Sequence, residues 1–162
     1  MSEDPVTPPE EELSTLRMRR AHLRRACDEL ERALAVPPAG RADDWARELA
    51  PVVARMREAF AAHISIVEGP DGLFDEIRAE SPRLEAMLRR LHREHDDIAA
   101  GLAAAEEDLS ARDEAAMEGV RERLTTVLAA LGRHRQRGTD LLYQAYEIDI
   151  GGELPSRAIR AR

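Results

Sequence analysis

Apolar residues recur every three or four positions along four long stretches of the chain, which places them on one face of a helix in each stretch. The first stretch covers about residues 10–36, and a pair of prolines ends it. The second is expected to begin at an N-cap supplied by Asp43 or Asp44. Because Pro51 lies inside the second stretch, we expect either a kink there or a short helix followed by a longer one.

A glycine- and proline-bearing segment, residues 68–72, ends the second stretch, and a short amphipathic turn is expected over residues 73–79. Ser81 and Pro82 then mark the start of the third stretch, because proline at the first helical position loses no hydrogen bond. The chain turns again around residues 110–113, and the fourth stretch fades at a pair of glycines.

Four amphipathic helices with mostly short connections predict an all-α fold, an up-down-up-down four-helix bundle. The low aromatic content, 3%, also favours helices over sheets. We expect the bundle to comprise residues 10–150, with a disordered tail at residues 1–9 and a loosely ordered tail at residues 151–162.

The net charge limits the classes of binding partner, and the cysteine content indicates the cellular compartment. A formal net charge of -8 argues against nucleic acid and against anionic membrane surfaces as partners. The start of the chain lacks the pattern of a signal peptide, and Cys27 is the single cysteine, so we expect a soluble protein of the cytoplasm. All 24 basic residues are arginine, a bias that indicates a GC-rich bacterial genome.

The histidines are the most informative residues. His63, His95 and His134 occupy apolar-stripe positions on three different predicted helices. A histidine among leucines must satisfy two ring nitrogens in a dry environment, so three of them directed at one core indicate a metal site. His22 lies one residue off the stripe of the first helix, where a wide buried face would still turn it inward, and His92 flanks the third stripe.

The expected heights of these histidines along the bundle axis do not all agree with a shared site. Counted from the predicted turns, the heights of His22 and His63 along the bundle differ by about 9 Å, and a similar offset separates His95 from His134.

Three arginines lie close to His134 in the sequence, namely Arg133, Arg135 and Arg137. An arginine beside an inward histidine could pair with a core carboxylate or admit an anion.

The order of these motifs resembles the hemerythrin-like (HHE cation-binding) family. That family places a lone histidine before His-x-x-x-Glu, His-x-x-x-His and His-x-x-x-x-Asp or Glu motifs. The counterparts here are His22, then HISIVE at 63–68, then LHREH at 91–95, then His134 ahead of Asp140. The segment that starts at Glu68, EGPDGLF, is similar to actinobacterial members of the family.

Three positions depart from the family pattern. Val67 stands where the family has a carboxylate and Glu68 follows it, while Thr139 stands at the second such position and Asp140 follows it. Leu91 replaces one histidine of the third motif. These departures favour one metal ion over an oxygen-bridged iron pair.

The resemblance implies a metal-binding protein, and the expected ligands are His22, His63, Glu68, His95 and His134. Iron, as one or two ions, is the expected cofactor, with zinc or no metal as the alternatives. The implied function is binding or sensing oxygen, nitric oxide or redox state, rather than enzymatic turnover. The competing hypothesis is a metal-free helical-bundle interaction module, in which the inward histidines form a buried network with Glu94, Arg137 or the tyrosines Tyr143 and Tyr146.

Overall fold

The computed structural model describes residues 10–146, and the two predicted tails, 1–9 and 151–162, lie outside the described residues. The elements in chain order are α1 (Glu10–Leu34), α2 (Ala42–Glu68), α3 (Leu73–Glu80), the short 3-10 helix η1 (Pro82–Leu84), α4 (Glu85–Asp108) and α5 (Glu114–Tyr146). Within the described range every secondary-structure element is a helix, which confirms the predicted all-α class.

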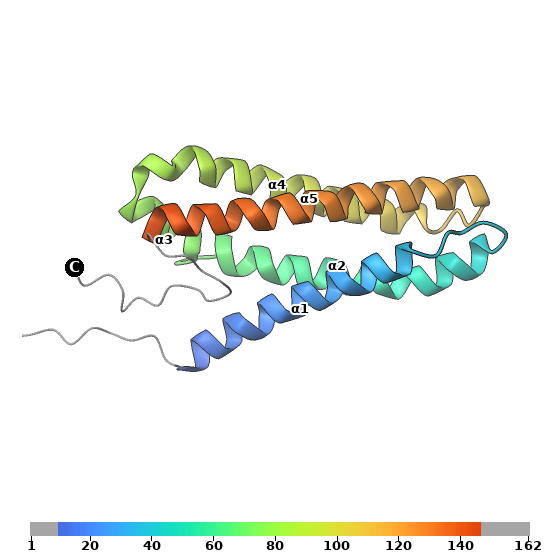
Figure 1. Ribbon diagram of the computed structural model, residues 1–162, viewed down its shortest axis with the longest axis horizontal. Coiled ribbons are helices and arrows are strands. Elements are labelled where there is room, and N and C mark those ends of the chain that lie inside the picture. The colour runs from blue at the N-terminus through green and yellow to red at the C-terminus, as the bar shows by residue number, and fades with distance from the viewer. Residues whose placement is uncertain (1–9, 147–162) are drawn as a thin grey trace, which may run out of the picture.

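The four long helices pack in pairs to form the bundle (Figure 1). α1 packs along α2 and α4 along α5, while contacts between α2 and α4 and between α1 and α5 join the two pairs. Figure 1 shows the amino-terminal half of α1 diverging from α4 and α5, and α3 lying across the end of the bundle between α2 and α4. The end of the bundle beside α3 is therefore enclosed chiefly by α2, α4 and α5.

The start and interior of α2 differ from the prediction. The N-cap position is occupied by Arg41, and Asp43 and Asp44 lie in the first turn without a capping hydrogen bond, so the predicted N-cap was wrong. Acidic side chains are favourable there because they face the positive end of the helix dipole. The helix is not divided at Pro51, which lies on its exposed side, where water can satisfy the carbonyl group that proline leaves unpaired.

The turn after α2 has a fixed geometry. A Cβ atom on Gly72 would lie only 2.7–2.9 Å from three carbonyl oxygens, those of Gly69, Ile66 and Val67, so only glycine fits. The expected amphipathic turn then forms α3, whose buried residues Phe74 and Ile77 anchor it to the bundle.

The third long helix starts later than the sequence indicated. Pro82 opens η1, and α4 begins only at Glu85.

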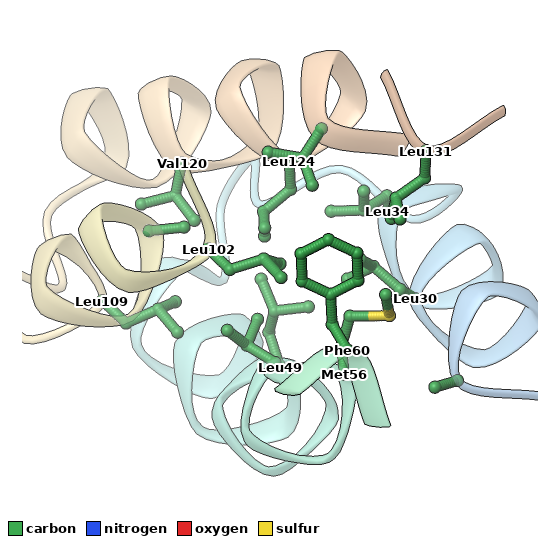
Figure 2. Close-up of a cluster of buried hydrophobic side chains, with 14 of the residues drawn as sticks. Leu30, Leu34, Leu49, Met56, Phe60, Leu102, Leu109, Val120, Leu124 and Leu131 are labelled. Atoms are coloured by element: carbon green, nitrogen blue, oxygen red, sulfur yellow. The ribbon is translucent and has the colours of Figure 1, made fainter. Parts of the chain in front are cut away.

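Two hydrophobic clusters form the core, and the buried histidines lie between them. The larger cluster draws on α1, α2, α4 and α5, with Phe60 near its centre (Figure 2). The smaller cluster lies around α3 and the adjoining ends of α2, α4 and α5, and includes Phe74 and Leu91. His95 contacts both Phe60 and Phe74, so it bridges the two clusters. Among the described helices, none combines the length and apolar character that crossing a membrane requires.

Replacing Leu124 by alanine should destabilise the protein strongly. Its side chain is fully buried in the larger cluster, and truncating such a leucine costs about 2–5 kcal/mol of unfolding free energy. The neighbouring Thr125 is exposed, so Thr125→Ala should change stability by no more than about 0.5 kcal/mol. Urea unfolding followed by circular dichroism compares the two variants, and equal losses would contradict this description of the core.

Candidate metal centre

Three imidazole rings meet between α2, α4 and α5. His63 comes from the last two turns of α2, His95 from the middle of α4 and His134 from the second half of α5. The Nε2 atoms of His95 and His134 are 3.0 Å apart, and those of His134 and His63 are 3.4 Å apart. His95 and His134 are buried and His63 is nearly so, which makes this the one group among the described residues with the composition and spacing of a metal site.

Glu68 fixes the orientation of His95. Its Oε1 atom accepts a hydrogen bond from Nδ1 of His95 at 2.5 Å and another from Nδ1 of His92 at 2.8 Å. Burial alone would raise the pKa of Glu68, but the hydrogen bonds from the two histidines outweigh it and bring the pKa below its ordinary value. An ionised Glu68 can only accept hydrogen bonds, so the proton in its contact with His95 is carried by Nδ1 of the histidine.

Glu94 fixes His134 in the same way. Its Oε2 atom accepts a hydrogen bond from Nδ1 of His134 at 3.0 Å, while its Oε1 atom forms an ion pair with Nε of Arg137 at 2.6 Å. Burial opposes ionisation of Glu94, yet the contacts with His134 and Arg137 bring its pKa below the usual range. Arg90, one turn earlier on α4, donates a hydrogen bond from its Nε atom to the same Oε1 atom at 3.3 Å.

The rings of His63 and His134 are neutral. Burial, reinforced by the neighbouring histidines and by Arg20, lowers the pKa of His63 to about 3. Burial also lowers the pKa of His134, and the hydrogen bond to Glu94 offsets only part of that effect. A neutral ring that is protonated on Nδ1 has a lone pair on Nε2, so the Nε2 lone pair of His134 faces the Nε2 atoms of His95 and His63.

This arrangement fits a metal ion. The Nε2 atom of His134 lies 3.0 Å from that of His95 and 3.4 Å from that of His63. Lone pairs directed at one another over such distances repel unless a cation or a proton lies between them. Two imidazole nitrogens bound tetrahedrally at the usual zinc distance of about 2.0–2.1 Å would themselves be about 3.3 Å apart. Carboxylates that accept from the opposite ring nitrogens are the outer partners that metal-binding histidines ordinarily have. The side chains can therefore receive an ion with little rearrangement.

The site is shielded by two aromatic rings and adjoins one open pocket. Phe60 contacts all three rings, and Phe74 is stacked on His95 with an interplanar angle of 12°. A pocket of about 230 Å³ opens on the α3 side, and its lining residues are Glu68, Phe74, Asp75, Arg78, Leu88, Arg89 and His92. Glu68 and Phe74 both line this pocket and contact His95, so they lie between the pocket and the His95 ring.

The structure brings together only part of the predicted ligand set. His63, His95 and His134 converge as expected, whereas His22 is exposed on α1 and lies outside the cluster. The cause is its direction: His22 lies about 100° around the helix from Leu23, which packs on the larger cluster. Glu68 reaches the site, but through Nδ1 of His95 rather than beside the Nε2 atoms.

Two further candidates lie near the site without joining the cluster. His92 is exposed and hydrogen bonded to Glu68. Asp140 accepts from Gln136 on its own helix, as a residue rotated away from His134 would.

The expected height difference between His95 and His134 disappears for two reasons. Backbone hydrogen bonds at Ser110 and Ala111 prolong the turn at the end of α4, which reduces the offset to about four residues, or about 6 Å. Helical side chains also lean toward their own amino terminus. Since α4 and α5 run in opposite directions, His95 leans away from the connecting turn and His134 leans toward it, and the rings meet.

Glu94 was expected near the inward histidines only in the metal-free hypothesis, and Glu68 was expected to bind the metal, whereas both carboxylates accept from Nδ1 of a clustered histidine. A signal was present, because Glu94 directly precedes His95 and Arg137 follows His134 by one helical turn. The suggestion that an arginine beside an inward histidine pairs with a core carboxylate is confirmed for Arg137 and Glu94.

Comparison with known protein families agrees with this geometry. The chain matches the family described as the Hemerythrin HHE cation binding domain over residues 12–146. It therefore belongs to the hemerythrin HHE cation-binding domain family. No curated protein and no solved structure matches the sequence significantly.

Replacing Glu68 by alanine should destabilise the metal-free protein. The change leaves the buried Nδ1–H group of His95 without its acceptor, which costs about 1–3 kcal/mol of unfolding free energy. Glu68→Gln keeps an acceptor oxygen and should cost less, and the exposed Glu58 on the same helix supplies the control Glu58→Ala. Urea unfolding in the presence of a chelator measures all three, and equal losses for Glu68→Ala and Glu58→Ala would contradict the assigned hydrogen bond.

Proposed function

We propose that this protein binds one metal ion, with iron preferred, between His63, His95 and His134, and that it binds or senses a small diatomic ligand or redox state there. The observation that carries the proposal is the convergence of the three Nε2 atoms, with Nδ1 of two of the rings held by carboxylates. The family assignment supports a cation as the occupant.

The residues divide the work of such a site. The three imidazoles hold the ion, Glu68 and Glu94 orient two of the rings, and Phe60 keeps bulk water from the rings. When bound, an iron ion supplies a redox-active Lewis acid, and three protein donors leave coordination positions for an external ligand. Imidazole donors suit iron, zinc and copper alike, so the preference for iron rests on the family resemblance.

A single ion is proposed because the nearby carboxylates are already engaged. Glu68 and Glu94 bind Nδ1 atoms, and Asp140 binds Gln136, so none of them stands between two candidate ion positions. With no carboxylate among the donors to stabilise high-valent iron, reversible binding or sensing is favoured over turnover. Oxygen and nitric oxide are the proposed ligands.

The second candidate is a metal-free bundle that acts as an interaction module. Two observations favour it: His92, Glu68 and His95 form one hydrogen-bonded chain, while Arg137, Glu94 and His134 form another connected chain. In that case a proton shared between the Nε2 atoms of His95 and His134 takes the place of the metal. The tyrosines expected in such a network lie elsewhere, since Tyr143 is exposed and Tyr146 donates to Glu76.

We also propose a bacterial, actinobacterial-type protein of the cytoplasm. The arginine-only basic composition and the single cysteine support this assignment.

Removing any one of the three histidines should abolish tight metal binding. We expect about one iron per chain in protein expressed in iron-supplemented medium, and much less in His63→Ala, His95→Ala and His134→Ala, because two imidazoles alone hold a divalent ion weakly. His22→Ala is the matched control and should keep the full metal content, since His22 is exposed outside the cluster. Elemental analysis of the purified proteins measures the metal content.

Each other outcome has a distinct meaning. Unchanged metal in the His95 and His134 variants would overturn the proposed site. Two irons per chain, with absorption bands of an oxygen-bridged pair, would overturn the single-ion proposal. No metal after reconstitution would favour the interaction module.

As a further check, a metal present at about 100 times its dissociation constant should stabilise the folded protein by about 2.7 kcal/mol.

A further inference from the structure

The two carboxylates that orient the histidines are held in different ways. Glu68 is the last residue of α2 and precedes the tight Gly69–Gly72 turn, so the backbone itself fixes its position. Its hydrogen-bond partners are two histidines, His92 and His95. Glu94 lies in the middle of α4, where the backbone does nothing to direct its side chain toward α5.

We propose that Arg137 is a positioning residue for the metal centre: by holding Glu94, it keeps His134 in the tautomer whose Nε2 atom faces His63 and His95. This inference deepens the proposed function and rests on it for its metal readout, but its structural part stands on the contacts of the metal-free protein.

The position of Glu94 on α4 shows why it needs a partner. It directly precedes His95, so the two side chains leave the helix about 100° apart, and Glu94 points toward the rim of the bundle. A carboxylate there would ordinarily turn outward to water. Instead it is 15% exposed and reaches across to Nδ1 of His134.

Arg137 supplies the restraint. It follows His134 by three residues on α5, so its guanidinium lies on the same side of the helix as the imidazole. Its Nε atom lies 2.6 Å from Oε1 of Glu94, while Oε2 of the same carboxylate binds the histidine. The arginine side chain is only 25% exposed, so this pair is less screened by water than the exposed ion pairs of the surface.

The restraint decides which nitrogen of His134 is available. If Glu94 leaves, Nδ1 loses its acceptor, and the ring can carry its proton on Nε2 or rotate, either of which removes one of the three lone pairs from the centre. Outer partners of this kind are typically worth 10–100-fold in metal affinity. Arg90 does not replace Arg137, because it lies on α4 itself with its side chain 59% exposed, so its hydrogen bond to Glu94 is screened by water and does not draw the carboxylate toward α5.

The test compares Arg137→Met with Arg137→Lys, which keeps the charge, and with Arg133→Met, an exposed arginine on the same helix as a control. The first readout is the tautomer of His134 in the metal-free protein, from long-range proton–nitrogen NMR spectra of histidine-labelled samples. The second is zinc affinity, from competition with a chromogenic chelator. Thermal unfolding establishes that each variant is folded.

We expect His134 to be protonated on Nδ1 in the natural protein, in Arg133→Met and largely in Arg137→Lys, and to show mixed tautomers in Arg137→Met. Zinc affinity should fall about 10-fold in Arg137→Met and recover most of this loss in Arg137→Lys. An unchanged tautomer together with an affinity within twofold of Arg133→Met would overturn the inference. If the natural protein binds no zinc or iron, the proposed function fails, and the tautomer readout alone decides the role of Arg137.

Should Arg137→Met fail to fold, Glu94→Ala addresses the same chain of contacts, with Asp96→Ala as its exposed control on α4. Loss of the Nδ1-protonated tautomer in Glu94→Ala alone supports the role of the carboxylate, and the Arg137→Lys variant then decides whether a cation must hold it. Identical tautomers in Glu94→Ala and Asp96→Ala would overturn the inference.

Discussion

Burial of three imidazole rings in one hydrophobic core is the constraint on which the rest of this structure depends. Each ring carries two nitrogens that need partners, and the leucine-rich interior offers none. The protein resolves this by bringing a carboxylate to Nδ1 of His95 and another to Nδ1 of His134. Satisfying these outer nitrogens leaves the inner ones facing each other, and a cation could satisfy that centre. The chemistry therefore follows from how the fold meets the cost of burying polar rings.

The elements around the histidines can be understood as supports for this arrangement. The turn after α2, which only glycine at position 72 allows, holds Glu68 at the helix end, and α3 places Phe74 against His95. The larger cluster, through Phe60, packs against the other side of the rings. Among its side chains that the structure describes, from residue 18 on, α1 contributes to that cluster from Leu23 onward and supplies no donor to the centre, which is consistent with its divergence from α4 and α5 (Figure 1).

Much of this could be read from the sequence, because helical periodicity reports burial directly. The four long helices and the three converging histidines follow from apolar spacing alone. Periodicity says less about the direction in which a side chain leaves the helix and about how far it extends along the bundle. A one-residue displacement turns His22 by about 100° and so out of the core, and the lean of side chains along antiparallel helices closes a gap of about 6 Å that counting residues leaves open between His95 and His134. Contacts between helices, such as that of Glu94 with His134, depend on relative rotations that the sequence of one helix does not contain.

The displaced carboxylate of α2 shows how a small change in spacing alters the kind of site. Five residues turn a helix by about 500°, so Glu68 points about 140° away from His63 rather than sharing its face, as a carboxylate at the position of Val67 would. That direction carries Glu68 toward α4, where it meets the outer nitrogen of His95 instead of the centre. Glu68 is thus an acceptor that orients an imidazole ring. Leu91 is buried where the family pattern has a further histidine, so the features that distinguish this centre are the carboxylates and the arginine behind the three imidazoles.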